Sequence, residues 1–182
     1  MIRHVPNILT LLRIAFIPLI IFCIHIEPEN FGRTLAALFF LAASATDFFD
    51  GIIARKFSSY SKFGEVLDPI ADKLLVSCTI LTLLKLNYVD LMPSIIIISR
   101  ELIISAIREM LAGKKIDLKV TFIAKVKTAM QMAAIFFLIL GSKASSIEII
   151  DNLGRLLIWA SSLITFYTAI LYISNSIKYF KD

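Results

Sequence analysis

Four aspartates are the residues of this chain whose type and spacing most clearly point to chemistry. Asp47, Asp50, Asp68 and Asp72 lie within 26 residues and make up half of the eight aspartates. Their spacings are i,i+3 and i,i+4, so on two helices each pair would share a face. Packed carboxylates repel one another and take up protons unless a cation neutralises them. Oxygen ligands without His or Cys favour Mg²⁺ or Mn²⁺ over zinc. The pattern therefore predicts a site for one or two divalent cations.

The segments that must position these aspartates are too apolar for a soluble protein. The chain has 182 residues, of which 58% are hydrophobic and 18% charged, against roughly 25% charged in soluble domains. We expect an all-α integral membrane protein with six transmembrane helices in a single domain covering residues 1–182. The expected spans are 8–26, 34–55, 64–86, 92–112, 121–141 and 152–177. The aspartates would then lie inside the second and third spans, where each ionised Asp costs about 2.5–3.5 kcal/mol unless compensated.

The positive residues orient these spans. With the N-terminus inside, 12 Lys and Arg residues fall on the inner side and 4 fall in outer loops, namely Arg33, Lys85, Lys143 and Arg155. This bias predicts that both termini are cytoplasmic and that the protein lies in the cytoplasmic (inner) membrane. The net charge of +5 is then explained by topology and by anionic lipid headgroups, and no nucleic acid partner is expected. Cys23 and Cys78 fit small buried apolar residues, because their spacing fits neither a disulfide framework nor a metal site.

The short turn between the second and third spans brings the two aspartate pairs together. A hairpin centred near Ser59 and Tyr60 sets Asp47 opposite Asp72 and Asp50 opposite Asp68 in the cytoplasmic half of the membrane. Small residues on the same faces, Gly51, Ala54 and Gly64, would let a helix or a ligand approach closely. Arg55 follows as a planar cation suited to phosphate. Taken singly, each of these residues also has a purely structural interpretation, as packing or as a topology marker.

Written out, the stretch is Asp47-x2-Asp50-Gly51-x2-Ala54-Arg55-x8-Gly64-x3-Asp68-x3-Asp72. It resembles the complete signature of the CDP-alcohol phosphatidyltransferase family, whose six-span layout is also similar. The resemblance implies transfer of a phosphatidyl group from a CDP-linked lipid to an alcohol with release of CMP, by a homodimer whose active site faces the cytoplasm. It further implies that the four aspartates bind two divalent cations, that Asp72 also serves as the base, and that Gly51, Ala54 and Arg55, with Asp47, contact the cytidine diphosphate.

Three further residues, Asn7, Thr10 and Ser61, are candidates for the CDP-diacylglycerol site. Asn7 and Thr10 form a polar stripe with Arg13 on an apolar helix, and the stretch resembles the start of the family's glycerol-phosphate branch. We therefore place Asn7 and Thr10 at the nucleotide, with an interfacial helix as the alternative. Ser61, three residues before Gly64, is a candidate for holding a donor phosphate, with loop solvation as the alternative.

Four cations bear on the acceptor alcohol: Arg100, Arg108, Lys125 and Lys127. Pointing into one cytoplasmic cavity, they would bind a phosphate on the acceptor. The alternatives are a helix–helix ion pair with Glu101 and, for the lysines, a topology marker. The Arg100-Glu101 and Lys125-x-Lys127-Thr128 elements resemble the family branch that makes phosphatidylglycerophosphate, although Ala124 stands where that branch usually has Gly. The resemblance implies sn-glycerol 3-phosphate as acceptor.

Several functional alternatives stay open at this point. An inositol phosphate or phosphatidylglycerol acceptor would also suit a cationic cavity. A divalent-cation or proton-coupled transporter would also need intramembrane carboxylates, but those would be spread through the membrane depth, usually in a repeated half. A non-catalytic scaffold would leave the cost of four aspartates unexplained.

Overall fold

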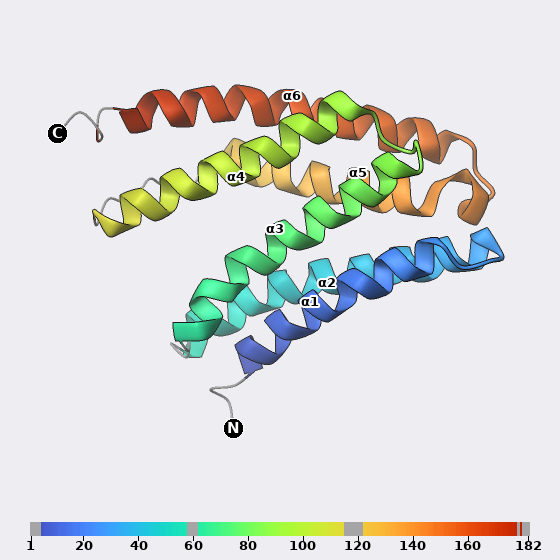
Figure 1. The fold of residues 1–182 in the computed structure, drawn as a ribbon, viewed down its shortest axis with the longest axis horizontal. Coiled ribbons are helices and arrows are strands. Elements are labelled where there is room, and N and C mark those ends of the chain that lie inside the picture. Colours follow the sequence, from blue (N-terminus) through green and yellow to red (C-terminus); the bar gives the residue numbers. More distant parts are fainter. Residues whose placement is uncertain (1–4, 58–61, 115–121, 178, 180–182) are drawn as a thin grey trace.

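The chain folds into six α-helices in the computed structural model, which describes residues 5–57, 62–114, 122–177 and 179. Within these ranges the side chains of 5–9, 47–57, 62–66, 68, 122 and 124 are not described. The helices are α1 Val5–Ile24, α2 Glu29–Phe57, α3 Lys62–Lys85, α4 Leu91–Gly113, α5 Phe122–Ser145 and α6 Ile149–Ile177 (Figure 1). No strand occurs in the part of the chain that the structure describes. The all-α prediction and its six helices are therefore confirmed.

Long apolar stretches explain the helices, and two helices in the described ranges meet the requirements of a membrane span by length and composition. These are Lys125–Ser145 and Ile149–Ile177, whereas Thr10–Ile24 forms a shorter apolar helix. Charged side chains interrupt the apolar stretches of α3 and α4, at Asp72, Lys73, Arg100 and Glu101 for example, which lowers their hydropathy. Passage of all six helices through a membrane stays a prediction.

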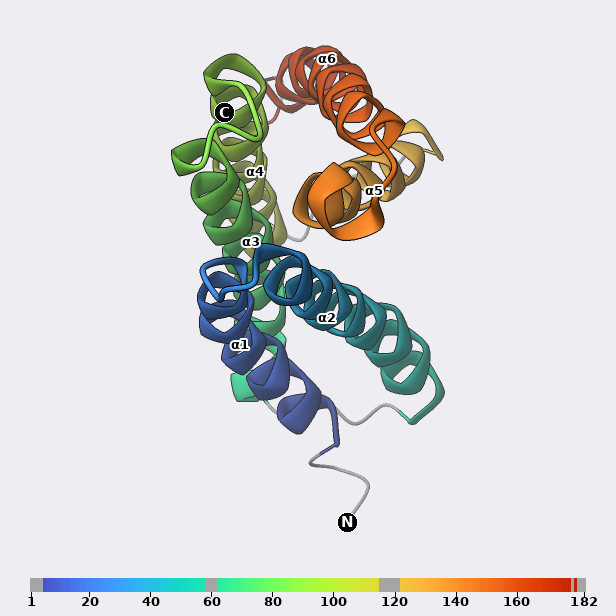
Figure 2. The same ribbon diagram turned by 90° about the vertical axis from the view of Figure 1, so that its right-hand side faces the viewer.

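The helices run along the length of the molecule and alternate in direction (Figures 1 and 2). α1 packs on α2 and α3, α2 packs on α5, and α6 packs on both α4 and α5. The connections 25–28, 86–90 and 146–148 meet at one end of the bundle, on the right in Figure 1, which we call the turn end. At the opposite end α2 finishes and α3 begins, and α1 starts and α6 ends on that same side.

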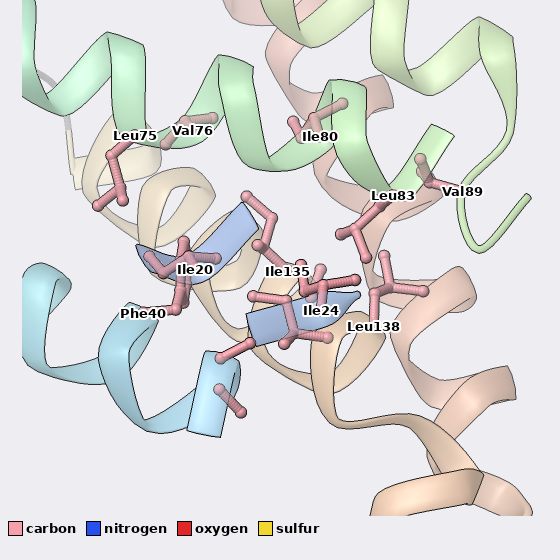
Figure 3. Packing of buried hydrophobic residues seen from close by; sticks show 14 of the residues in the cluster. Ile20, Ile24, Phe40, Leu75, Val76, Ile80, Leu83, Val89, Ile135 and Leu138 are labelled. Carbon is pink, nitrogen blue, oxygen red and sulfur yellow. The ribbon is translucent and has the colours of Figure 1, made fainter. Parts of the chain in front are cut away.

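Apolar side chains from all six helices form the core, most of them from α1, α2, α3 and α5 (Figure 3). Ile20, Phe40, Leu75, Ile80 and Ile135 are each at most 1% exposed and pack in one cluster. Between apolar helices such close packing supplies dispersion contacts, which matter most where the surroundings are themselves apolar. This core holds α3 and α5 at fixed positions, and both helices contribute to the site described below.

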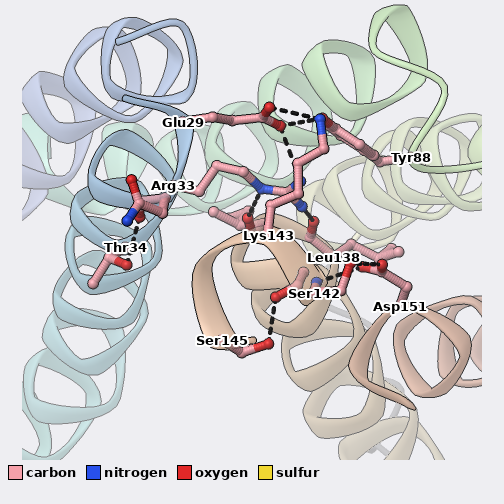
Figure 4. A network of polar contacts seen from close by, with 12 residues as sticks. Glu29, Arg33, Thr34, Tyr88, Leu138, Ser142, Lys143, Ser145 and Asp151 are labelled. Carbon is pink, nitrogen blue, oxygen red and sulfur yellow. Dashed lines mark hydrogen bonds and ion pairs between the residues drawn. The ribbon is translucent and has the colours of Figure 1, made fainter. Parts of the chain in front are cut away.

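The turn end is held by Arg33, which the sequence analysis had placed in an outer loop. Arg33 instead lies in the second turn of α2, and its side chain is 2% exposed. Its Nε donates to the carbonyl of Ile139 and its Nη2 to the carbonyl of Leu138, both at 2.7 Å, while Tyr88 stacks 4.1 Å from the guanidinium carbon (Figure 4). The loop prediction was wrong because α2 begins at Glu29, where a carboxylate is favoured in the first helical turn.

The other three cations assigned to outer loops also lie in helices: Lys85 ends α3, Lys143 lies in α5 and Arg155 in α6. The reason for Lys143 is that α5 continues beyond a break at Gly141, whose φ of 59° and ψ of 179° interrupt the helix. Such a break frees carbonyls of the preceding turn from their helical partners. Arg33 binds two of these carbonyls, those of Leu138 and Ile139. The break therefore supplies acceptors for the buried arginine, and the arginine satisfies carbonyls that the break leaves unpaired.

Glu29 completes this end of the bundle. It accepts hydrogen bonds from the Tyr88 hydroxyl at 2.7 Å and from Lys143 Nζ at 2.6 Å. The Lys143 bond, followed by the Tyr88 bond, holds the pKa of the Glu29 carboxyl below its usual value. Beyond the break, the Ser142 backbone N–H donates to Asp151 Oδ1 at 2.9 Å and ties α5 to α6.

Candidate active site

The four aspartates lie in the helices that the sequence predicted. Asp47 and Asp50 belong to the last three turns of α2, and Asp68 and Asp72 to the first three turns of α3. Their placement in helices, and not in the connecting turn, is therefore confirmed. The side chains of Asp47, Asp50 and Asp68 lie outside the described residues, so their convergence on shared cations stays a prediction.

The residues proposed for the nucleotide are described in part. Gly51, Ala54 and Arg55 belong to α2 and Asn7 belongs to α1, but their side chains, like the whole of Ser61, lie outside the described residues. Thr10 is described and is buried in α1 at 2% exposure. Their contacts with a nucleotide stay predictions.

A cavity of about 920 Å³ lies beside Asp72, bounded mainly by α3, α4 and α5. Asp72 is half-buried and lines it. All four cations proposed for the acceptor line the same cavity, namely Arg100, Arg108, Lys125 and Lys127. The structure thus brings together the candidate base and the candidate phosphate-binding residues, which come from three helices.

Positive charge prevails in this cavity. Among the lining residues that the structure describes, five are cationic and three are carboxylates (Asp72, Glu101 and Glu109), which gives a formal charge of +2. The fifth cation is Lys73, next to Asp72 in α3. A recessed site with excess positive charge attracts and holds anionic ligands, phosphate above all.

Glu101 neutralises part of this charge from α4. A single oxygen, Oε1, accepts from Lys127 Nζ at 2.7 Å and from Arg100 Nη1 at 3.0 Å. The exposed fractions of the side chains are 2% for Lys127, 10% for Arg100 and 22% for Glu101. The helix–helix ion pair considered as an alternative therefore exists between α4 and α5. Because two cations share one carboxylate, the pair leaves a net positive charge beside the cavity.

Arg108 and Lys125 lie more openly at the cavity. Both side chains are exposed, and the Arg108 guanidinium carbon lies 5.6 Å from the ring centre of Tyr172 on α6. Among the carboxylates that the structure describes, none forms an ion pair with either residue. These two cations can therefore turn to an incoming anion without breaking an existing ion pair.

Lys73 and Gln131 are among the polar lining residues that the sequence analysis did not assign. Lys73 donates a hydrogen bond to the Ser105 hydroxyl of α4. Gln131 is 3% exposed and lies one helical turn beyond Lys127 on α5. For Gln131 the available signal was the i,i+4 spacing from Lys127, which places both on one helix face.

The residues present fit a divalent cation in their chemistry. Asp72 presents a half-buried carboxylate at the cavity, and the other three candidate ligands are carboxylates as well, the hard oxygen donors that Mg²⁺ and Mn²⁺ prefer. Among the side chains that the structure describes, no three carboxylate, His or Cys groups form a metal-binding cluster. The candidate metal site therefore depends on Asp47, Asp50 and Asp68 joining Asp72.

Comparison with known proteins decides the family. A family model described as CDP-alcohol phosphatidyltransferase matches residues 3–167. The chain belongs to the CDP-alcohol phosphatidyltransferase family. Its members are enzymes and generally depend on a divalent cation, which agrees with the aspartate signature in α2 and α3.

Relatives within this family match nearly the whole chain. A protein of Rickettsia felis named CDP-diacylglycerol–glycerol-3-phosphate 3-phosphatidyltransferase is 46% identical over 178 residues, covering 98% of each chain. A protein of Wigglesworthia glossinidia brevipalpis with the same name is 37% identical, covering 93% of this chain and 92% of its own. A third, from Pectobacterium atrosepticum, is 34% identical, covering 94% and 93%.

Proposed function

We propose that the protein transfers the phosphatidyl group of CDP-diacylglycerol to sn-glycerol 3-phosphate, giving phosphatidylglycerophosphate and CMP. The observation that carries this proposal is the cavity in which Asp72 lies with Arg100, Arg108, Lys125 and Lys127. A carboxylate beside excess positive charge suits an acceptor that carries both a reacting hydroxyl and a phosphate. The names of the relatives support glycerol 3-phosphate as this acceptor.

In the proposed reaction the primary hydroxyl of glycerol 3-phosphate attacks the β-phosphorus of CDP-diacylglycerol. The new phosphorus–oxygen bond forms as the bond to CMP breaks, and CMP leaves with that electron pair. Asp72 takes the proton of the attacking hydroxyl, acting as a general base. Arg108 and Lys125, supported by Arg100 and Lys127, hold the acceptor phosphate, so that the hydroxyl is presented in line.

Asp47, Asp50, Asp68 and Asp72 would hold two divalent cations, Mg²⁺ or Mn²⁺. Bound there, the cations would neutralise the diphosphate of the donor and stabilise its leaving oxygen. Seven residues are proposed to contact CDP-diacylglycerol: Asn7, Thr10, Asp47, Gly51, Ala54, Arg55 and Ser61. They belong to α1, α2 and the connection that follows α2, near the end where α3 carries Asp72.

A membrane setting explains how a lipid donor reaches this site. Large apolar side chains cover the outside of the bundle, and Phe22, Leu102, Leu156, Leu163 and Phe166 are each more than half exposed, which suits contact with acyl chains. We propose that all six helices span the cytoplasmic membrane with both termini and the cavity on the cytoplasmic side. The acyl chains would then stay in the bilayer while the nucleotide faces water. Assembly as a homodimer stays a prediction.

The decisive experiment measures CMP release by the purified protein in mixed micelles. CMP and phosphatidylglycerophosphate should form only when CDP-diacylglycerol, glycerol 3-phosphate and Mg²⁺ or Mn²⁺ are all present. Inositol phosphate, serine and phosphatidylglycerol, offered in the same assay, should compete poorly as acceptors. Preferred use of one of these would correct the acceptor. Absence of CMP release with every acceptor, together with metal flux into proteoliposomes, would overturn the proposal in favour of a transporter.

A further inference from the structure

The uncharged polar residues of the cavity differ in what they already bind. Of the described residues, four of this kind line it: Ser44, Ser105, Thr128 and Gln131. The Ser44 hydroxyl donates to the Phe40 carbonyl at 2.8 Å, Ser105 accepts from Lys73, and Thr128 has a partner of its own. Gln131 stands apart, because its side-chain oxygen is buried and no described group donates to it.

An unpartnered amide at such a position is costly, and few of them occur in folded proteins. Gln131 is 3% exposed, so its own helix and the neighbouring side chains shield it from solvent. The oxygen and nitrogen of a Gln amide exchange places by a half-turn of the last torsion, so the group can present an acceptor or a donor to the cavity. Nearby, Arg100 also keeps a buried Nε without a described partner.

These two groups have complementary needs: an amide oxygen calls for a hydroxyl donor, and a guanidinium N–H calls for an oxyanion. Glycerol 3-phosphate offers both, since it has a phosphate, a primary hydroxyl that reacts and a secondary hydroxyl that does not. Under the proposed function the phosphate is taken by the cations and the primary hydroxyl by Asp72. The secondary hydroxyl is left without a partner.

We propose that Gln131 binds the secondary hydroxyl of the acceptor and thereby selects a glycerol phosphate over other phosphate-bearing alcohols. This inference rests on the proposed function and adds a residue that determines specificity. A buried site built to hydrogen-bond a hydroxyl discriminates strongly against an analogue lacking that hydroxyl, because the protein group is then left unpaired. A charged lining alone would not discriminate in this way, since it responds to the phosphate that both compounds share.

The test compares glycerol 3-phosphate with 3-hydroxypropyl phosphate, which differs by loss of the secondary hydroxyl. With the full-length protein in micelles containing CDP-diacylglycerol and Mg²⁺, kcat/KM should be about 10- to 100-fold higher for glycerol 3-phosphate. In Gln131→Leu the value for glycerol 3-phosphate should fall by about that factor, while the value for the analogue changes by less than about threefold. Gln131→Met, which is unbranched and close in length, should behave alike and serves if the Leu variant does not fold.

Met132→Leu is the matched control, because Met132 is the apolar neighbour of Gln131 in the same lining; both substrates should keep their kcat/KM within about threefold. Equal losses for both substrates in the Gln131 variants would assign the residue a structural role and overturn the inference. So would a wild-type protein that uses the two acceptors equally well, a result that needs no variant. Wild-type protein that releases no CMP with glycerol 3-phosphate would instead contradict the proposed function itself.

Discussion

The turn end and the cavity are both clusters of buried charge in one helical bundle, but they differ in completeness. At the turn end, Arg33 and Glu29 find their partners in Tyr88, Lys143 and two carbonyls of α5. At the cavity, two cations share one oxygen of Glu101, and buried groups of Arg100 and Gln131 have no described partner. The first cluster is satisfied by the protein alone, whereas the second is suited to a ligand that completes it.

Two arginines, Arg33 at 2% exposure and Arg100 at 10%, show the difference most directly. Arg33 uses Nε and Nη2 on carbonyls at 2.7 Å, so its planar fork fixes the geometry of the helix break. Arg100 pairs through Nη1 with its neighbour in sequence, Glu101, and no group that the structure describes accepts from its Nε. Substitutions at the turn end should therefore change stability, and substitutions at the cavity should change turnover or substrate affinity.

The largest effect is expected at the candidate base. Asp72→Asn should lower kcat for CMP release by about 10²- to 10⁴-fold, because an amide cannot accept the proton of the attacking hydroxyl. Asp151→Asn is the matched control, since Asp151 binds Ser142 at the turn end; it should leave turnover within about threefold. Near-normal turnover by Asp72→Asn would show that another group takes the proton.

The next largest effect concerns stability. Arg33→Met should lower the free energy of unfolding by about 3 kcal/mol, since it leaves buried carbonyls unpaired and removes the ion pair that Arg33 forms with Glu29 at 3.4 Å. Chemical unfolding in detergent, followed by circular dichroism, measures this change. Arg155→Met, which removes one long hydrogen bond of 3.4 Å at an exposed site, should cost less than about 1 kcal/mol. If the free energy of unfolding fell equally in the two variants, the buried bonds of Arg33 would contribute no more than the exposed bond of Arg155.

A smaller effect is expected for a cation that faces the cavity. Arg108→Ala should raise the KM for glycerol 3-phosphate about tenfold and leave kcat within about threefold, because the guanidinium binds the acceptor phosphate in ground and transition states alike. The control is Lys143→Ala, an exposed cation at the turn end, which should leave this KM unchanged. An unchanged KM in Arg108→Ala would show that Arg108 does not bind the acceptor phosphate, and would leave it as a topology marker that packs on Tyr172.

The smallest effect is a pH dependence at Glu29. Because its pKa is lowered below 4.5 in the folded protein, the ionised carboxylate stabilises the fold above about pH 4.5, and this contribution is lost as the pH falls through the lowered pKa. At pH 7, Glu29→Gln should therefore melt about 2 °C below wild type. The difference should vanish as the pH falls below the lowered pKa. A difference that persists there would mean that shape, not charge, explains the contribution of Glu29.

The sequence was sufficient to predict the helices but not their ends. Long and mostly apolar stretches predict six helices, and the i,i+3 and i,i+4 spacings place the aspartates within them. The stretch 27–30 looks like a loop because it combines Pro28 with polar residues, yet α2 begins at Glu29. The spacing of Glu29 and Arg33, four residues apart, was the local signal of a helix that the loop assignment overlooked.

At the cavity, the charged residues could be predicted from the sequence, whereas the uncharged polar residue Gln131 could not. Arg100, Arg108, Lys125 and Lys127 were predicted because a cation within an apolar stretch requires an explanation. Glu101 was considered as a partner for one of them, but the sharing of one oxygen by Arg100 and Lys127 depends on how α4 lies against α5. Gln131 carries no charge, and its i,i+4 spacing from Lys127 indicates only a shared helix face, so its burial beside the cavity could be found only in three dimensions.

The hydrogen bonds from Arg33 to the carbonyls of α5 have a consequence for the order in which the fold is completed. Residue 33 is synthesised more than 100 residues before the carbonyls of Leu138 and Ile139 that receive it. Until α5 has been made, Arg33 has Glu29 of its own helix at 3.4 Å but lacks both of its carbonyl acceptors. The link that Arg33 makes between α2 and α5 can therefore form only late in synthesis of the chain.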